Sequence, residues 1–268
     1  MPVLVNGGVG LLDPLDRGLQ YGDGLFETMA VQDGRARFLA SHLDRLTEGA
    51  RRLAMPLPDP EHLSTQISAA WPHGRGVVKL LWTRGAMGRG YRPPANPQPT
   101  CIAAGFAWPE WPPGAWSEGI RLRYCRTRLG CNAALAGIKH LNRLEQVLAR
   151  AEWSDESIAE GLMLDQRGQV ISGTQSNLFA VIDGLLLTPA LDQCGVDGVM
   201  RRAVWRWAAA NGISVAEAGL RPEALETATE IFVSNALIGA WPVRELAGMP
   251  VPAGSLAGRF NSWLAEQR

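Results

Sequence analysis

The stretch LAGIKHLNRLEQVLARAEW, residues 135–153, decides how this sequence is interpreted. Four apolar residues in it follow the spacing of one helix face: Leu141, Leu144, Leu148 and Ala151. Asn142, with Glu145 three residues later, has the pattern of a capping box, so the sequence predicts a helix beginning near residue 142. Lys139 lies just before this predicted start.

Lysine is scarce in the chain, because 24 of the 26 basic residues are Arg and only Lys79 and Lys139 are Lys. Arginine replaces lysine where charge alone is required, but it cannot lose its proton and attack a carbonyl. The positive end of the predicted helix disfavours a nearby ammonium, which suits Lys139 to act as a Schiff-base amine or general base. Lys79, in the apolar run VVKLLW, is interpreted as a strand residue whose stem packs and whose amine reaches water.

The composition is that of a globular protein, with 268 residues, 46% of them hydrophobic and 19% charged. This length predicts one large or two ordinary domains. The 26 basic and 26 acidic residues balance. Non-specific binding to a phosphate backbone needs a basic excess, so we expect no nucleic-acid partner. No run approaches the roughly 18 apolar residues that a spanning helix needs, so we also expect no membrane association.

The four cysteines lie at Cys101, Cys125, Cys131 and Cys194, and none forms a C-x-x-C pair. No His stands near them at the spacing of zinc ligands, so we expect no metal site. The start of the chain lacks the basic and apolar pattern of a signal peptide. Free thiols in a reducing compartment are therefore expected, and with them a cytoplasmic location.

The segment WPEWPPGAWSEG, residues 108–119, marks a boundary, because its three prolines and two glycines can continue neither a helix nor a central strand. We therefore predict a smaller domain at 1–107, a linker at 108–119 and a larger domain at 120–268. Strands are expected at 77–83, 101–107, 120–125, 161–165, 177–182, 185–187 and 230–234, and further helices at 41–53 and 198–211. Strands and helices in both halves predict two domains of the α+β class.

Further motifs along the chain resemble one known family. They are YGDGLFET (21–28), SHLDRL (41–46), TRGAMGRGY (83–91), SGTQSNLF (172–179), LDQCGVDGVMR (191–201) and IFVSNALIGAWPV (231–243). Together with residues 135–153, they resemble the fold-type IV family of pyridoxal phosphate-dependent enzymes, and within it the lyase branch. The resemblance spans almost the whole chain and implies a fold like that of D-amino acid aminotransferase, with Lys139 as the Schiff-base lysine.

The resemblance also implies contacts to the cofactor, pyridoxal 5'-phosphate. Arg45 matches the arginine that binds its phosphate, a task that suits a planar donor. Backbone amides at a helix start are implied as further phosphate ligands, at Gly198, Val199 and Met200. Ala236, which follows a predicted strand, matches one more backbone contact.

Ser172 departs from the family pattern, because most members carry Glu there, paired with the pyridine nitrogen of the cofactor. A serine hydroxyl offers a neutral hydrogen bond and cannot hold a proton on that nitrogen as an anion does. The cofactor should then withdraw electrons more weakly. We hypothesise that Ser172 favours an elimination over transamination.

The resemblance implies a lyase of folate biosynthesis that converts 4-amino-4-deoxychorismate to 4-aminobenzoate and pyruvate. This substrate carries two carboxylates, and the candidate partners for them are Arg84, Arg89, Tyr91 and Arg128. An aminotransferase acting on D-amino or branched-chain amino acids is the alternative, since it would share Lys139 and Arg45. A protein that binds the cofactor without turnover is a second alternative. The family further implies a homodimer.

Overall fold

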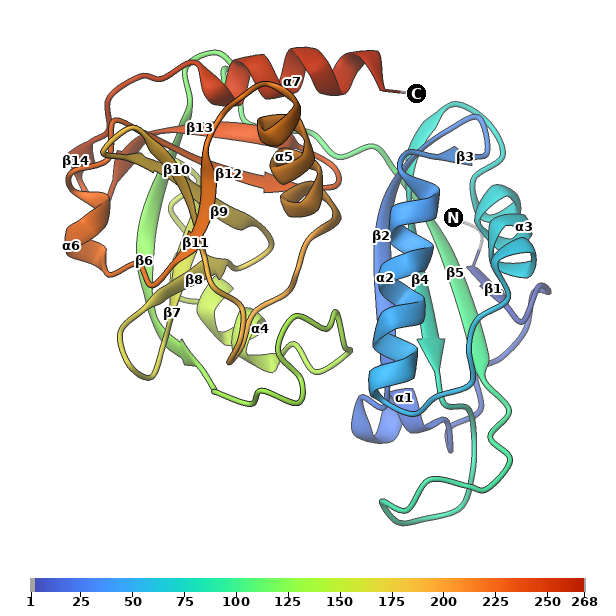
Figure 1. Ribbon diagram of the computed structural model, residues 1–268. Helices are drawn as coiled ribbons and strands as arrows, with labels where there is room; N and C mark the ends of the chain where they lie inside the picture. Colours follow the sequence, from blue (N-terminus) through green and yellow to red (C-terminus); the bar gives the residue numbers. More distant parts are fainter. Residues whose placement is uncertain (1–2, 268) are drawn as a thin grey trace. The chain divides into compact units, whose positions relative to one another are not determined.

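The computed structural model describes residues 3–267. The chain divides into two compact units, which Figure 1 shows as ribbons coloured along the sequence. The first unit comprises residues 1–110 and 138–142, and the second comprises residues 111–137 and 143–268. The division at 110/111 lies inside the predicted linker. The short return of residues 138–142 to the first unit was not predicted.

The first unit is built on a five-stranded antiparallel sheet with the strand order β1-β5-β4-β2-β3. The strands are β1 (Val3–Val5), β2 (Gly24–Gln32), β3 (Arg35–Ala36), β4 (Arg75–Thr83) and β5 (Thr100–Ala107). Its helices are α1 (Arg17–Tyr21), α2 (Leu39–Arg52) and α3 (Pro60–Ala70). Leu25, Met29 and Val31 alternate along β2 and are buried with apolar side chains of α2. Helices α2 and α3 thus cover one face of this sheet.

The second unit contains a nine-stranded mixed sheet with the order β11-β10-β9-β12-β13-β6-β7-β8, and β14 pairs with β13. The strands are β6 (Ile120–Leu129), β7 (Ile158–Asp165), β8 (Val170–Gly173), β9 (Asn177–Ile182), β10 (Leu185–Pro189), β11 (Val215–Ala218), β12 (Glu230–Asn235), β13 (Gly239–Leu246) and β14 (Met249–Pro250). The helices are α4 (Leu144–Arg150), α5 (Val199–Ala210), α6 (Pro222–Leu225) and α7 (Leu256–Glu266). The predicted α+β class is confirmed.

Tryptophans attach the proline-rich segment after residue 110 to the second unit. The rings of Trp111 and Trp116 both meet Trp241 edge-on, with centroids 5.1 and 5.6 Å away. The Trp116 indole also donates to the carbonyl of Ile238 over 2.8 Å. Packing of this kind explains why a segment that can form neither helix nor strand is still ordered.

Two predicted helix starts are wrong. The helix predicted at 41–53 begins at Leu39, with Phe38 at its N-cap, so Ser41 lies inside α2. The helix after Lys139 begins at Leu144, and no side chain caps it. The residues of the expected capping box are engaged elsewhere: Asn142 donates to the carbonyl of Gly22, and Glu145 accepts from the amide of Gly130.

The apolar stripe predicted on this helix does not pack either. Leu144 is 76% exposed and Leu148 is 61% exposed. Lys139 stands five residues before the first helical residue, farther from the helix start along the chain than the sequence predicted.

Candidate active site

Lys139 lies on an extended segment bound to the start of β2 in the first unit. The amide of Phe26 donates to the carbonyl of Lys139 over 3.0 Å, and the amide of Leu141 donates to the carbonyl of Gly24 over 2.9 Å. Ile138 is buried in the core of the first unit. Because neighbouring side chains of an extended chain point to opposite sides, Lys139 points away from that core. Its Nζ lies 4.2 Å from the centroid of the Phe26 ring.

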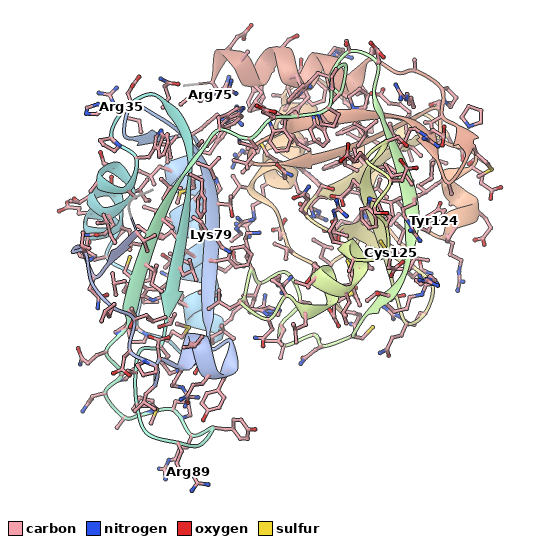
Figure 2. All side chains as sticks on the ribbon, turned by 180° about the vertical axis from the view of Figure 1, so that it is seen from behind. Arg35, Arg75, Lys79, Arg89, Tyr124 and Cys125 are labelled. Carbon is pink, nitrogen blue, oxygen red and sulfur yellow. The ribbon has the colours of Figure 1, made fainter. Side chains whose placement is uncertain are left out.

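The second lysine of the chain lies against the same ring. Lys79 is on β4 (Figure 2), and its Nζ is 5.3 Å from the Phe26 centroid. Its backbone is paired with Thr28 of β2, so the two side chains share one face of the sheet. Lys79 is a strand residue as expected, but its position beside Phe26 was not predicted. The rarity of lysine was the signal that could have found it.

A buried ionic cluster occupies the opposite face of β2. The guanidinium of Arg45 donates to both carboxylate oxygens of Glu27, and Nδ1 of His42 lies 2.6 Å from the second oxygen. All three side chains are at most 7% exposed. The two-point contact fixes the plane of the Arg45 guanidinium. Glu27 was not predicted. Its signal was a charged residue at one of the buried positions of the alternating strand GLFETMA.

Glu27 and His42 shift each other's pKa, and Arg45 shifts the pKa of both. Burial opposes ionisation of Glu27, but the charges of Arg45 and His42 and their hydrogen bonds outweigh burial and lower the Glu27 pKa to about 2. The pKa of His42 is lowered, first by burial and then by Arg45 and Lys139, against the opposing effect of Glu27. Because an ionised carboxylate only accepts hydrogen bonds, the Nδ1–H of His42 donates to Glu27.

Of the predicted substrate-binding residues, Arg84 serves the structure of the first unit. It is 6% exposed and donates to Asp23 and to the carbonyls of Leu53 and Ala54. Burial raises the pKa of Asp23, but hydrogen bonds and charge from Arg84 and Arg17 lower it overall. These contacts explain Arg84 without a ligand.

Arg89 and Tyr91 lie on the loop between β4 and β5, where Figure 2 shows Arg89 at the far end. Tyr91 is 83% exposed, and its ring meets Tyr21 edge-on at 5.3 Å. Arg17 anchors the loop by donating to the carbonyls of Gly90 and Tyr91. The loop is thus held by Arg17 and by Tyr21, whose hydroxyl accepts from the amide of Gly90, and it presents Arg89 and Tyr91 outward.

In the second unit, α5 begins at Val199 with Gly198 as its N-cap, as predicted. No side chain caps this helix, so the amides of its first turn are available to a ligand. Asn177 braces the preceding segment by donating to the carbonyl of Val196. A Cβ on Gly198 would lie 2.1 Å from the Asn177 side-chain oxygen, so any larger residue would have to displace the Asn177 side chain. A helix start with open amides and a glycine at its N-cap fits a phosphate group.

Ser172 is the last residue but one of strand β8 and is buried, with its hydroxyl donating to the carbonyl of Gly173 over 2.9 Å. A hydroxyl rotates about its C–O bond, so the same hydrogen can be redirected from the Gly173 carbonyl to a ligand. Behind it, Glu160 accepts hydrogen bonds from Thr174, Gln175 and Ser176 and so fixes the turn. Glu160 was missed, although a lone carboxylate in an apolar strand was visible in the sequence.

The remaining predicted residues lie in open positions or loops. Ala236 is in the turn after β12, where Asn235 accepts from the amides of Leu237 and Ile238. Arg128 is exposed on β6 and donates to the carbonyl of Cys125. The turn supplies backbone groups, and Arg128 supplies an exposed charge.

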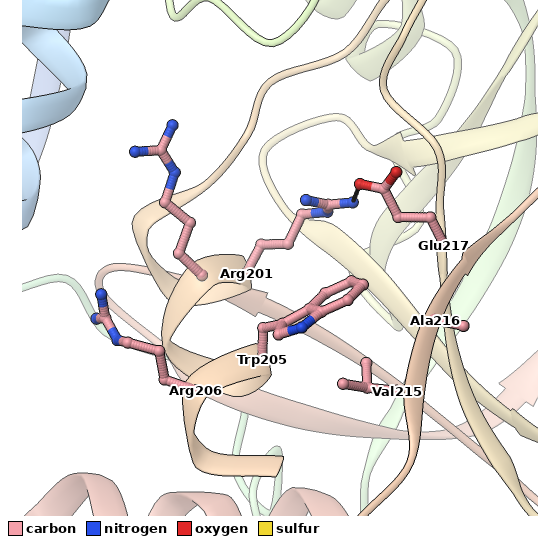
Figure 3. A pocket seen from close by; sticks show the side chains of 7 residues that line it. Arg201, Trp205, Arg206, Val215, Ala216 and Glu217 are labelled. Atoms are coloured by element: carbon pink, nitrogen blue, oxygen red, sulfur yellow. Dashed lines mark hydrogen bonds and ion pairs between the residues drawn. The ribbon is translucent and has the colours of Figure 1, made fainter. Parts of the chain in front are cut away.

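A shallow pocket lies on the side of α5 that faces β11 (Figure 3). It is lined by Arg201, Arg202, Trp205, Arg206, Val215, Ala216 and Glu217. Arg201 is paired with Glu217 at 2.6 Å and with Asp197 at 3.1 Å. The pair with Glu217 connects α5 to the edge strand β11, so Arg201 has a structural explanation.

Within residues 3–267, no helix combines the length and apolar composition that crossing a membrane requires. The same part of the chain has no group of three or more His, Cys, Asp or Glu side chains placed to hold a metal ion.

The chain belongs to the class IV aminotransferase family, whose model, described as amino-transferase class IV, matches residues 24–246. This confirms the resemblance and the fold inferred from the motifs. Within the family, the chain is 36% identical over 252 residues to the aminodeoxychorismate lyase of Vibrio harveyi, covering 92% of this chain and 93% of the relative.

Solved structures agree with this comparison. The crystal structure of 4-amino-4-deoxychorismate lyase from Pseudomonas aeruginosa matches with a TM-score of 0.94 and 46% identity, over 99% of this chain and 98% of that chain. The branched-chain amino acid aminotransferase of Escherichia coli matches with a TM-score of 0.86 and 26% identity, over 97% of this chain and 92% of that chain.

Proposed function

We propose that this protein is a pyridoxal phosphate-dependent lyase that converts 4-amino-4-deoxychorismate to 4-aminobenzoate and pyruvate. The observation that carries the proposal is the identity of 46% over 99% of the chain to a solved lyase of this name, against 26% to an aminotransferase. Lys139, held on β2 beside Phe26, supplies the amine that such chemistry requires.

The residues described above fit the cofactor. In the first unit, Lys139 would bind its carbonyl carbon. The family resemblance implies Arg45 as a phosphate ligand, and its guanidinium already donates to both oxygens of Glu27 on the face of β2 opposite Lys139. In the second unit, the open start of α5 at Gly198, Val199 and Met200 supplies amides for the phosphate, together with the turn at Ala236. Ser172 would meet the pyridine nitrogen. When bound, the cofactor supplies an electron sink for the carbon that loses a proton.

Lys139 then acts as the general base. Its Nζ removes the proton from the ring carbon that bears the amine, and the bond from the neighbouring carbon to the enolpyruvyl oxygen breaks. The leaving enol takes up a proton and becomes pyruvate, while the ring becomes aromatic. The backbone hydrogen bond between Phe26 and Lys139 holds the chain at the base in one position, which limits the orientations of the amine.

The two carboxylates of the substrate need cationic or hydroxyl partners. We propose Lys79 and Thr28 for one of them, because these side chains share the sheet face on which Lys139 meets Phe26. Arg89, Tyr91 and Arg128 remain exposed candidates for the other. Arg84 is left out because its guanidinium is committed to Asp23 and two carbonyls.

We also propose a homodimer in the cytoplasm. The dimer is supported by exposed apolar side chains of the first unit, among them Val9 at 95% and Leu11 at 98% exposure. The cytoplasmic location is supported by the four cysteines, which are free thiols.

The test is to supply purified protein with aminodeoxychorismate and to measure 4-aminobenzoate and pyruvate. Keto-acid formation from D-alanine and leucine is measured in parallel. We expect equal amounts of the two lyase products and no keto acid. Keto acid without 4-aminobenzoate would replace the lyase with an aminotransferase. Yellow protein that is inert on every amine would leave a cofactor-binding protein without turnover.

A further inference from the structure

Within the described part of the chain, two buried hydroxyls of the second unit have no hydrogen-bond partner, those of Tyr124 and Ser234, and of the two only Ser234 is a fully buried residue. Ser234, near the end of β12, is 0% exposed, and its Oγ has no hydrogen-bond partner among residues 3–267. A buried polar group without a partner is costly, and most such groups in folded proteins are satisfied by protein or by a bound molecule. The hydroxyl of Ser172 is also buried, but it donates to the carbonyl of Gly173. The Ser234 hydroxyl thus lacks the hydrogen-bond acceptor that the Ser172 hydroxyl has.

The position of Ser234 shows where a partner would be. Ser234 is paired across the sheet with Asn177 of β9, and side chains of such a pair lie on the same face. The Asn177 side chain on that face binds the carbonyl of Val196 and touches Gly198, the N-cap of α5. Helix α5 packs against β12. The unpartnered hydroxyl therefore faces the start of α5.

This start favours an anion. Helix α5 has 12 residues, has no side-chain cap and has no acidic residue in its first turn. Its dipole and first amides attract negative charge, and a hydroxyl beside them adds one more donor. An anion at this place would satisfy the orphan hydroxyl and the uncapped amides together.

We propose that the Ser234 hydroxyl donates a hydrogen bond to the phosphate group of the cofactor. The inference rests on the proposed function and adds a side-chain ligand to the backbone amides of α5. A hydrogen bond to a charged acceptor is stronger than one between neutral groups. Because the hydroxyl is unpartnered without the cofactor, its removal should weaken the bound state and leave the apoprotein no less stable.

The experiment compares wild-type protein, Ser234→Ala and the control Ser172→Ala, each stripped of cofactor. Dissociation constants for pyridoxal phosphate and for pyridoxal, which lacks the phosphate, are measured by absorbance. Thermal unfolding of each apoprotein is followed with and without inorganic phosphate. We expect Ser234→Ala to weaken pyridoxal phosphate about tenfold, to leave pyridoxal unchanged, and to reduce stabilisation by inorganic phosphate. Ser172→Ala should affect pyridoxal phosphate and pyridoxal equally.

The midpoint of unfolding of the Ser234→Ala apoprotein should equal or exceed that of wild type. Equal weakening of pyridoxal phosphate and pyridoxal, or a lowered apoprotein midpoint, would show a structural role and overturn the inference. Unchanged affinity for pyridoxal phosphate would show that water alone satisfies the hydroxyl, which would overturn it as well. Wild-type apoprotein that binds no pyridoxal phosphate would contradict the proposed function too, so the two failures are distinguishable.

Discussion

The two units offer a charged ligand different kinds of groups, charged side chains in the first and backbone amides with hydroxyls in the second. In the first unit, formal charges are gathered on β2 and α2: Glu27 and Arg45 form a buried pair, and Lys139 and Lys79 lie against one ring. In the second unit, the start of α5 offers backbone amides, a glycine and hydroxyls, with Gly198 and Ser234 at its centre. Charges carry reactivity and respond to pH, whereas amides and hydroxyls give recognition that hardly titrates. Substitutions in the first unit should therefore change reactivity and pH dependence, whereas substitutions in the second unit should change the affinity for the ligand.

The largest expected effect comes from Lys139. Lys139→Ala removes the general base and the covalent attachment, so turnover should fall by about 10⁴-fold or more. Lys79→Ala is the matched control, since it removes the second amine beside Phe26. It should raise KM for aminodeoxychorismate and leave the cofactor attached. Steady-state kinetics and the absorbance of bound cofactor check both variants, and an active Lys139→Ala protein would refute the role of this lysine.

The next effect is on stability in acid. Glu27→Ala leaves Arg45 and His42 buried without their carboxylate, which should lower the free energy of unfolding by about 3–5 kcal/mol. Denaturant unfolding at pH 7 measures this loss.

The pH dependence follows from the Glu27 pKa, which is lowered from 4.5 to about 2 in the folded protein. A lowered carboxyl pKa stabilises the fold above pH 4.5, and this contribution is lost as the pH falls from 4.5 toward 2. It amounts to about 3 kcal/mol. Glu27→Gln should be less stable at pH 7 and should lose this part of the pH dependence. Parallel stability curves for Glu27→Gln and wild type in that range would contradict the coupling.

A smaller effect is expected at the start of α5. Gly198→Ala places a Cβ 2.1 Å from the Asn177 side-chain oxygen, although the backbone angle itself, with φ of −66°, suits alanine. The crowding should cost about 1–3 kcal/mol of stability and weaken pyridoxal phosphate. The double variant with Asn177→Ala should recover part of both losses, measured by thermal unfolding and by cofactor titration. No recovery would mean that the Cβ clashes with something else.

The smallest effect tests whether Ser172 selects the reaction. Ser172→Glu supplies an anion that holds a proton on the pyridine nitrogen, so aminotransferase activity with D-alanine should appear and lyase turnover should change only several-fold. Ser172→Ala is the neutral control. If Ser172→Glu raised lyase turnover and produced no aminotransferase activity, serine would not be selecting the reaction. Both activities are measured on the same preparations.

Much of the fold could be predicted, because buried strands and helix faces leave regular patterns. The run at 77–83, the helix from Gly198 to Asn211 and the strand at 230–234 all correspond to elements of the structure. Helix starts were predicted less well, because Asn142 and Glu145 bond to residues far away in the chain. Local capping rules cannot anticipate a side chain that a tertiary contact engages.

Of the site residues, those marked by motifs could be named from the sequence, and their supports could not. The family resemblance implied Lys139 and Arg45, and both stay predictions. Glu27, Glu160 and Ser234 were not implied by it, because each matters through a partner or a missing partner that only the fold reveals. The same holds for Arg84, whose sequence context suggested substrate binding while its contacts with Asp23 and two carbonyls explain it fully.

The central claim is that Lys139 carries the cofactor, and borohydride reduction followed by peptide mapping tests it most directly. The protein is first saturated with pyridoxal phosphate, reduced and digested. We predict the stable label on the peptide that contains Lys139 and none on the peptide that contains Lys79, although both amines lie against Phe26. Label on Lys79, or no label on either peptide, would contradict the account.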